Sequence, residues 1–163
     1  MEESKMEHTK TFAGKDYEIV TDTDILSRKS TPCFFDELNI LKNKAIANIM
    51  LNTAFAFGND CFGLSSNQVG ESKRIILMIN PFTSSLAFSI MCNPLIYCKK
   101  GGVRSMWEGC ISRPGEKKIK VRRHKNIKVK WQTVTGESKQ REFTGMIARI
   151  IGHQIDHING VLI

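Results

Sequence analysis

Apolar residues recur at steps of three and four positions in two stretches of the chain. In residues 36–57 this period predicts an amphipathic helix that ends at Gly58. In residues 144–158 the same period predicts a second helix, with Thr144 at its N-terminal cap and Gly160 just beyond its end. The two predicted helices lie near opposite ends of the chain, so the segments between them decide the fold class.

The segments between the helices show the patterns of short strands. Four runs are expected to be extended, residues 74–79, 86–97, 118–121 and 127–131. Asn93-Pro94 should interrupt the second run, and residues 124–126 should form a turn between the last two, which alternate apolar and charged side chains. A further hairpin turn is expected at Gly136-Glu137, before residues 141–143. Residues 1–31 are polar and are expected to be largely irregular, with a short extended piece around residues 17–20.

Strands that surround one buried helix predict an α+β fold. The length of 163 residues fits one domain spanning residues 1–163. No apolar run approaches the roughly 20 residues of a membrane span, and the first ten residues are too polar for a signal peptide. We therefore expect a monomer of the cytoplasm or of an organelle interior, with no membrane partner.

The cysteines and the charge narrow the class further. Five cysteines in an irregular arrangement argue against a disulfide framework. The formal charge is +8, and nine Lys or Arg residues lie between Arg113 and Lys130 against one acid, Glu116. A solvated strand face is the ordinary explanation. Contact with a polyanion is the alternative, but no aromatic residues are interleaved with the cations in this run.

Two histidines, His153 and His157, stand four residues apart on one face of the second predicted helix. This spacing can bring both imidazoles to one metal ion, although buried histidines without a metal are the ordinary alternative. A zinc or iron site usually takes four ligands, so two are missing. The thiol of Cys110 would supply a third and leave one position open, which is typical of a catalytic site.

Three segments in this order resemble the peptide deformylase family. Gly63–Gln68 is similar to the family's GLAAxQ segment, Glu108–Ser112 to EGCLS, and His153–Gly160 to HExDHxxG. The resemblance runs from about the first predicted helix to the end of the chain. It implies an α+β fold in which antiparallel β-sheets surround a central metal-binding helix.

The resemblance also implies a function, namely a metal-dependent hydrolase that removes the N-formyl group from the N-terminal methionine of newly made polypeptides. Cys110, His153 and His157 would hold one divalent metal ion, Fe(II) in cells, with Zn, Ni or Co as alternatives in prepared protein. Negative charge develops on the formyl oxygen during the reaction. The side-chain amide of Gln68 and the backbone N–H of Ile111 would donate hydrogen bonds to it.

The substrate is expected to lie along the backbone of Gly63, where a side chain would block its approach. The residues expected to contact it are Phe62, Gly63, Gly109, Arg149, Ile150 and His153. Arg149 replaces an apolar residue of the family one turn before His153, where it should reshape the methionine pocket. Glu108 is expected to have a structural role, paired with Arg122.

Gln154 is the main departure from the family, which has glutamate at this catalytic position. A carboxylate can take and return a proton, whereas a neutral amide cannot. Loss of such a group typically costs ~10²- to 10⁴-fold in rate, so we expect metal and peptide binding with strongly reduced activity. A shape-preserving change in an otherwise intact ligand set favours an engineered substrate-trapping variant of the enzyme. A naturally inactive homologue that binds formyl peptides is the alternative.

Other features leave further interpretations open. Ser65 and Ser66 replace the paired alanines of the first motif, which adds polar atoms near the substrate. The sequence ends three residues after Gly160, so we do not expect the additional C-terminal helix that bacterial members often use at the ribosome, and the basic strands at 113–130 could provide a different contact. A third interpretation is a basic RNA-associated protein in which Cys110 and the histidines hold a structural zinc. N-formyl-methionyl peptides remain the expected partners of the leading interpretation.

Overall fold

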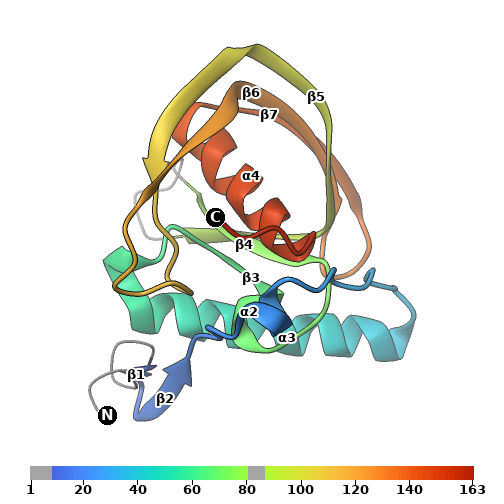
Figure 1. Ribbon diagram of the computed structural model, residues 1–163. Coiled ribbons are helices and arrows are strands. Elements are labelled where there is room, and N and C mark those ends of the chain that lie inside the picture. The colour runs from blue at the N-terminus through green and yellow to red at the C-terminus, as the bar shows by residue number, and fades with distance from the viewer. Residues whose placement is uncertain (1–8, 81–86) are drawn as a thin grey trace.

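The computed structural model describes residues 9–80 and 87–163 (Figure 1). Its elements in chain order are β1 (Thr9–Phe12), β2 (Lys15–Glu18), α2 (Thr23–Leu26), α3 (Glu37–Phe57), η1 (Gly58–Asp60), β3 (Gly63–Ser65), η2 (Ser66–Val69), β4 (Ile75–Asn80), β5 (Ala87–Glu108), β6 (Ile119–Gln132), β7 (Ser138–Thr144) and α4 (Gly145–Ile158).

Strands β3 to β7 form one antiparallel sheet in the order in which they occur along the chain. The long strands β5 and β6 arch over α4, which lies inside the curve, while α3 lies below on the other side of β3 and β4 (Figure 1). Strands β1 and β2 pair separately as a hairpin. The α+β fold with antiparallel sheets around a central helix is confirmed.

Helix α3 occupies the range that the apolar period predicts. The Asp36 side chain accepts a hydrogen bond from the Asn39 backbone N–H at 3.1 Å, which caps the helix. The helix ends at Gly58, whose φ of 53° is open to glycine at little cost. Its buried side chains, Met50 and Ala54 among them, pack against β3 and β4 in the larger part of the core.

Strand β5 does not break at Asn93-Pro94 as expected. It runs for 22 residues, and the interruption is a shift of register between Cys92 and Leu95. Asn93 has a φ of 50°, and its side chain bonds both the N–H and the carbonyl of Cys33, so the irregular residue is held by its neighbours. Residue 86, the expected start of this strand, lies outside the described residues.

Strand β6 is also longer than expected. The predicted turn at residues 124–126 is wrong, because residues 119–132 form one strand that pairs with β5 throughout and with β7 over its second half. Polar residues can continue a strand when the backbone N–H and C=O groups form hydrogen bonds with the neighbouring strands. The predicted hairpin turn at Gly136 is confirmed: Gly136 has a φ of 93°, and the Thr133 N–H donates to the Glu137 carbonyl at 2.9 Å.

The N-terminal segment is more regular than expected. Within residues 9–31, β1 and β2 form a hairpin around Ala13-Gly14, and α2 follows with Asp22 as its cap. The expectation for residues 1–8 falls outside the described residues. All five cysteines are free, in agreement with the absence of a disulfide framework.

Helix α4 begins after Thr144, as predicted, although the Thr144 side chain makes no capping hydrogen bond. Most of its residues are buried, and its isoleucines pack with Ile76 of β4 and Val129 of β6 in the second part of the core. The helix therefore carries His153 and His157 into the interior of the arch. Within the described ranges, no helix has both the length and the apolar character needed to cross a bilayer.

Candidate active site

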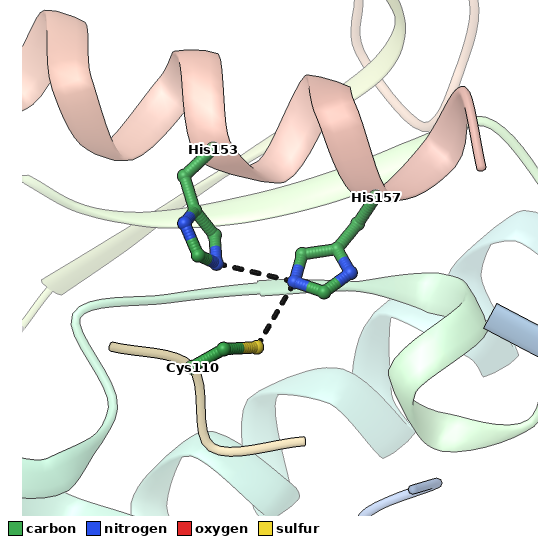
Figure 2. A group of neighbouring side chains, drawn as sticks. All are labelled: Cys110, His153 and His157. Carbon is green, nitrogen blue, oxygen red and sulfur yellow. Dashed lines mark hydrogen bonds between the residues drawn. The ribbon is translucent and has the colours of Figure 1, made fainter. Parts of the chain in front are cut away.

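Cys110, His153 and His157 converge on one point although they come from two distant segments (Figure 2). The Cys110 Sγ lies 3.1 Å from the Nε2 of His157, and this Nε2 lies 3.1 Å from the Nε2 of His153. The three ligand atoms all lie within 4.8 Å of one another. The loop after β5 and one turn of α4 thus bring together the three expected metal ligands.

In the metal-free cluster Cys110 and His153 stabilise each other as thiolate and imidazolium, so a metal ion would displace a proton from His153 when it binds. Burial alone would raise the pKa of the Cys110 thiol, but hydrogen bonds from both histidines and their charge outweigh burial and lower this pKa to about 6. Burial alone would lower the pKa of His153, but its bonds with Cys110 and Glu108 raise it to about 9. The sulfur is therefore held as the thiolate, the form that binds metal ions.

The three donors fit a divalent metal ion. His153 Nδ1 lies 3.1 Å from Glu108 Oε2, and this contact fixes the ring so that Nε2 faces the other two ligand atoms. One sulfur and two imidazole nitrogens on a single centre suit zinc, iron, cobalt or nickel. This is the donor set of a metal site that keeps a coordination position for water or substrate.

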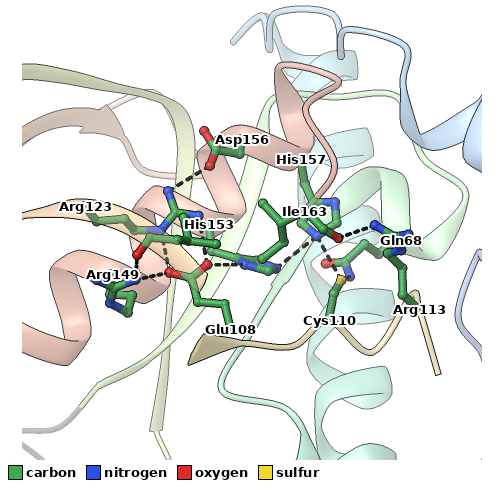
Figure 3. A network of polar contacts seen from close by, with 11 residues as sticks. Gln68, Glu108, Cys110, Arg113, Arg123, Arg149, His153, Asp156, His157 and Ile163 are labelled. Atoms are coloured by element: carbon green, nitrogen blue, oxygen red, sulfur yellow. Dashed lines mark hydrogen bonds and ion pairs between the residues drawn. The ribbon is translucent and has the colours of Figure 1, made fainter. Parts of the chain in front are cut away.

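Glu108 joins the metal-ligand cluster to a network of buried charges (Figure 3). It is 8% exposed, and it accepts hydrogen bonds from Arg123 at 2.7 and 2.9 Å and one from Arg149. Arg123 also pairs with Asp156 at 2.7 Å. Burial would raise the pKa of Glu108, but its bonds with His153 and the two guanidinium groups lower this pKa to about 2.

The structure corrects the expected partner of Glu108 and shows what Arg149 contacts. The partner of Glu108 is Arg123 rather than Arg122, because successive residues of β6 point to opposite faces and Arg123 is the one that points inward. Arg149 is buried. Its guanidinium donates to Glu108, to the Arg104 carbonyl at 2.6 Å and to the Val121 carbonyl at 3.2 Å.

Gln68 reaches the metal ligands from η2 on the other side of the cluster. Its Nε2 donates to Ser112 Oγ at 3.0 Å and lies 3.6 Å from Cys110 Sγ. Its Oε1 accepts from the backbone N–H and the hydroxyl of Ser65, both at 3.0 Å. The Ser65 backbone N–H thus fixes which end of the amide faces the cluster, while the Ser65 hydroxyl lies between Gln68 Oε1 and Asn67 Oδ1, the latter at 2.7 Å.

Gly63 and Gln154 face each other between β3 and α4. A Cβ atom on Gly63 would lie 2.8 Å from Ile150 Cγ2, 3.1 Å from Gln154 Nε2 and 3.1 Å from the Leu77 carbonyl. Gln154 is buried, and its Oε1 finds no hydrogen-bond partner among the described residues. An unpaired buried amide oxygen is costly, so this position is shaped for something other than packing.

The remaining expected residues lie around the same cluster. Phe62 is exposed beside Gly63. Gly109 precedes Cys110, and the stem of Lys118 lies over it, 3.4 Å from the place a Cβ would take. No described residue accepts a hydrogen bond from the Ile111 backbone N–H.

Comparison with known proteins decides the family. The Polypeptide deformylase family model matches residues 17–163, which is most of the chain. The chain belongs to the peptide deformylase family. It is 36% identical over 125 residues to a peptide deformylase of Dictyoglomus thermophilum, a match that covers 75% of this chain and 74% of the relative.

Solved deformylase structures show the same fold. A Met-Ala-Ser-bound class I type b peptide deformylase from Acinetobacter baumannii is 30% identical, with a TM-score of 0.78 over 90% of this chain and 96% of the other. A probable peptide deformylase from Synechococcus phage S-SSM7 is 32% identical, with a TM-score of 0.79 over 90% and 96% of the two chains. The chain is a deformylase-type hydrolase with a Cys/His/His metal site.

Sequence reasoning missed three residues that support this deformylase site. Arg123 holds Glu108, Ser112 holds Gln68, and the buried Asn67 Nδ2 donates to the His157 carbonyl at 2.8 Å. Strand alternation offered a signal for Arg123, since Glu108 must point inward beside Cys110. Asn67 and Ser112 lie inside the first two motifs, but their roles could not be predicted because their partners lie 90 and 44 positions away.

Proposed function

We propose that this deformylase binds N-formyl-methionyl peptides at the Cys110, His153 and His157 cluster and that Gln154 strongly reduces hydrolysis of the formyl group. The Met-Ala-Ser bound to the Acinetobacter baumannii neighbour supports the peptide class, because Met-Ala-Ser is what remains when such a peptide loses its formyl group. The peptide is expected to lie alongside β3, where Gly63 packs so closely on α4 that any side chain would collide with Ile150.

The roles of the chain's own groups follow from their positions. Cys110, His153 and His157 would hold the divalent ion, which supplies Lewis-acid chemistry that activates water near neutral pH. The Ile111 N–H, which has no acceptor among the described residues, and the Gln68 amide donate hydrogen bonds to the formyl oxygen as its negative charge grows. Ser65 and Ser112 hold the Gln68 amide in this orientation.

The unpaired Oε1 of the buried Gln154 is the observation that carries the proposal. We take position 154 as the one from which a carboxylate would accept a proton from water and return it to the leaving amine. An amide accepts a hydrogen bond but does not bind the proton at neutral pH, so the proton transfers lose their carrier. The similar size of the two side chains preserves the packing, which suits a substrate-trapping form of the enzyme.

The proposal extends to properties that the geometry supports less directly. We propose that the cellular metal is Fe(II), that residues 1–163 form a single domain and that the protein is a monomer. Contact with the ribosome through the basic strands at 113–130 stays a prediction.

Changing Gln154 to Glu tests the proposal. With the bound metal measured in both proteins, Gln154→Glu should raise formate release from formyl-Met-Ala-Ser by ~10²- to 10⁴-fold. Gln140→Glu, the same amide-to-carboxylate change at an exposed position of β7, is the matched control and should leave the rate unchanged. Equal rates in all three metal-loaded proteins would refute the role of Gln154. Failure of the parent protein to bind the peptide would instead favour a structural zinc site.

A second candidate is a naturally inactive homologue that binds formyl peptides without turnover. It is favoured by departures that a single engineered change at Gln154 does not explain. Arg149 is buried against Glu108, and the Ser65 hydroxyl is bonded to Gln68, so the surroundings of the site have changed as well. This candidate predicts tight peptide binding and no gain of formate release in Gln154→Glu.

A further inference from the structure

Positive charge is concentrated in the arch above α4. Residues 87–144, which form β5, β6, β7 and the loops between them, contain 14 Lys or Arg residues and 4 acids, whereas the rest of the chain contains 10 and 12. Glu108 is buried inside the arch, and the other three acids, Glu116, Glu137 and Glu142, each lie beside a Lys or Arg. The outer surface of the arch therefore carries a large excess of cations.

An exposed tryptophan lies among these cations. Because Glu108 points inward, its neighbour Trp107 points outward, and 66% of its surface is exposed. Lys120 of β6 lies directly opposite Trp107, and Arg122 lies one pair further along the same face, opposite Ser105. No described carboxylate forms an ion pair with Lys120 or Arg122.

A second aromatic ring occupies the other end of the same strand pair. Lys130 Nζ lies 4.8 Å from the centre of the Tyr97 ring, and 44% of Tyr97 is exposed. Leu95, also exposed, is the direct partner of Lys130. A groove of about 550 Å³ opens at this end, lined by Leu95, Lys130 and the amides of Asn93, Gln132 and Gln140 among others.

This arrangement differs from the sequence expectation in a specific way. No aromatic residue is interleaved with the cations along residues 113–130, and this argued against nucleic acid. The structure supplies the interleaving across the strands, with rings from β5 and cations from β6. Ten residues separate the two rings along β5, which corresponds to roughly 30 Å of extended chain.

We propose that the outer face of β5 and β6, defined by Tyr97, Trp107, Lys120, Arg122 and Lys130, binds single-stranded nucleic acid without sequence preference. Aromatic rings offer stacking surfaces to bases of any identity, and the unpaired cations match the phosphates. Binding to a flat bilayer would not explain why exposed rings lie at both ends of this curved strand pair. A duplex hides its bases from stacking, so it would use only the cations.

Fluorescence anisotropy with a labelled 12-nucleotide single-stranded RNA of mixed sequence tests the proposal on the full chain. Trp107→Ala should weaken binding by roughly 5- to 150-fold, and Trp107→Phe should restore most of the loss because the ring remains. Lys120→Ala/Arg122→Ala should reduce the slope of log affinity against log salt by about 1.4, the value for two lost phosphate contacts. Single-stranded DNA of the same sequence should bind comparably.

The control variant removes two positive charges from a different part of the surface. Lys42→Ala/Lys44→Ala neutralises two exposed lysines of α3 and should leave affinity and salt slope nearly unchanged. The proposal is overturned by absence of binding at 50 mM salt, or by equal losses in the two double variants. It is also overturned if Trp107→Ala binds like the parent protein, or if duplex RNA or anionic phosphatidylserine vesicles bind more tightly than the single strand. Circular dichroism checks that each variant is folded.

Discussion

Replacing Glu108 by glutamine removes the buried carboxylate that Arg123 and Arg149 share. Arg123 retains Asp156, but Arg149 has no other carboxylate partner among the described residues. Removing one partner of a buried ion pair typically costs roughly 3–5 kcal/mol, because the remaining charge stays buried and uncompensated. For a protein of this length each kcal/mol corresponds to roughly 2–4 °C, so Glu108→Gln should lower the melting temperature by roughly 6–20 °C.

The measurement is the free energy of unfolding, followed by circular dichroism in urea, with a chelator present so that metal binding does not contribute. Arg149→Met removes the cation that Glu108→Gln leaves without a partner and keeps an unbranched side chain. The double variant should therefore be less destabilised than the sum of the two single variants, by roughly 1–3 kcal/mol. Glu137→Gln, which breaks an exposed pair with Lys139, is the control and should change stability by less than about 0.5 kcal/mol.

Two results would refute the reasoning about Glu108. A loss below about 1 kcal/mol in Glu108→Gln would mean that the two guanidinium groups do not depend on its charge. Strict additivity of Glu108→Gln and Arg149→Met would mean that Arg149 is held by the Arg104 and Val121 carbonyls alone.

Two further predictions concern the site itself. Gly63→Ala should lower the free energy of unfolding by roughly 1–3 kcal/mol, because its Cβ would lie 2.8 Å from Ile150 Cγ2; a variant as stable as the parent protein would contradict this packing. Cys110→Ser should weaken zinc binding by more than ~10-fold in a chelator competition, since a hydroxyl is a poor substitute for a thiolate, whereas Cys98→Ser, on β5 away from the cluster, should bind zinc like the parent protein. Equal affinities in the two cysteine variants would place the metal elsewhere.

The helices and the histidine pair could be predicted from the sequence because their signals are local, whereas Cys110 was proposed as a donor from a distant segment and supported by the family resemblance. The three-to-four-residue period sets the range of α3, and Asp36 and Gly58 mark its ends. The four-residue spacing of His153 and His157 requires only one helical turn. The strands were predicted in pieces. Asn93 does leave the extended conformation, with a φ of 50°, but the strand continues past it, and residues 124–126 carry turn-forming side chains that the pairing with β5 holds extended.

The site's charge network needed the tertiary structure. Arg122 and Arg123 are adjacent and chemically identical, and only the register of β6 against β5 decides that Arg123 faces Glu108. Arg149 lies on the expected helix, but the direction of its side chain depends on carbonyl groups of two strands that arch over it.

The sequence by itself determined the two helices, the thiol and imidazole groups that can hold a metal ion, and the amide at position 154. Helical spacing and donor chemistry are properties of a few neighbouring residues, so no distant contact is needed to recognise them. Only the tertiary structure decided which arginine pairs with Glu108, that β5 and β6 are continuous, and that aromatic rings meet cations on the outer face. Those outcomes depend on the pairing of strands far apart in sequence, where a shift of one residue turns every side chain to the opposite face.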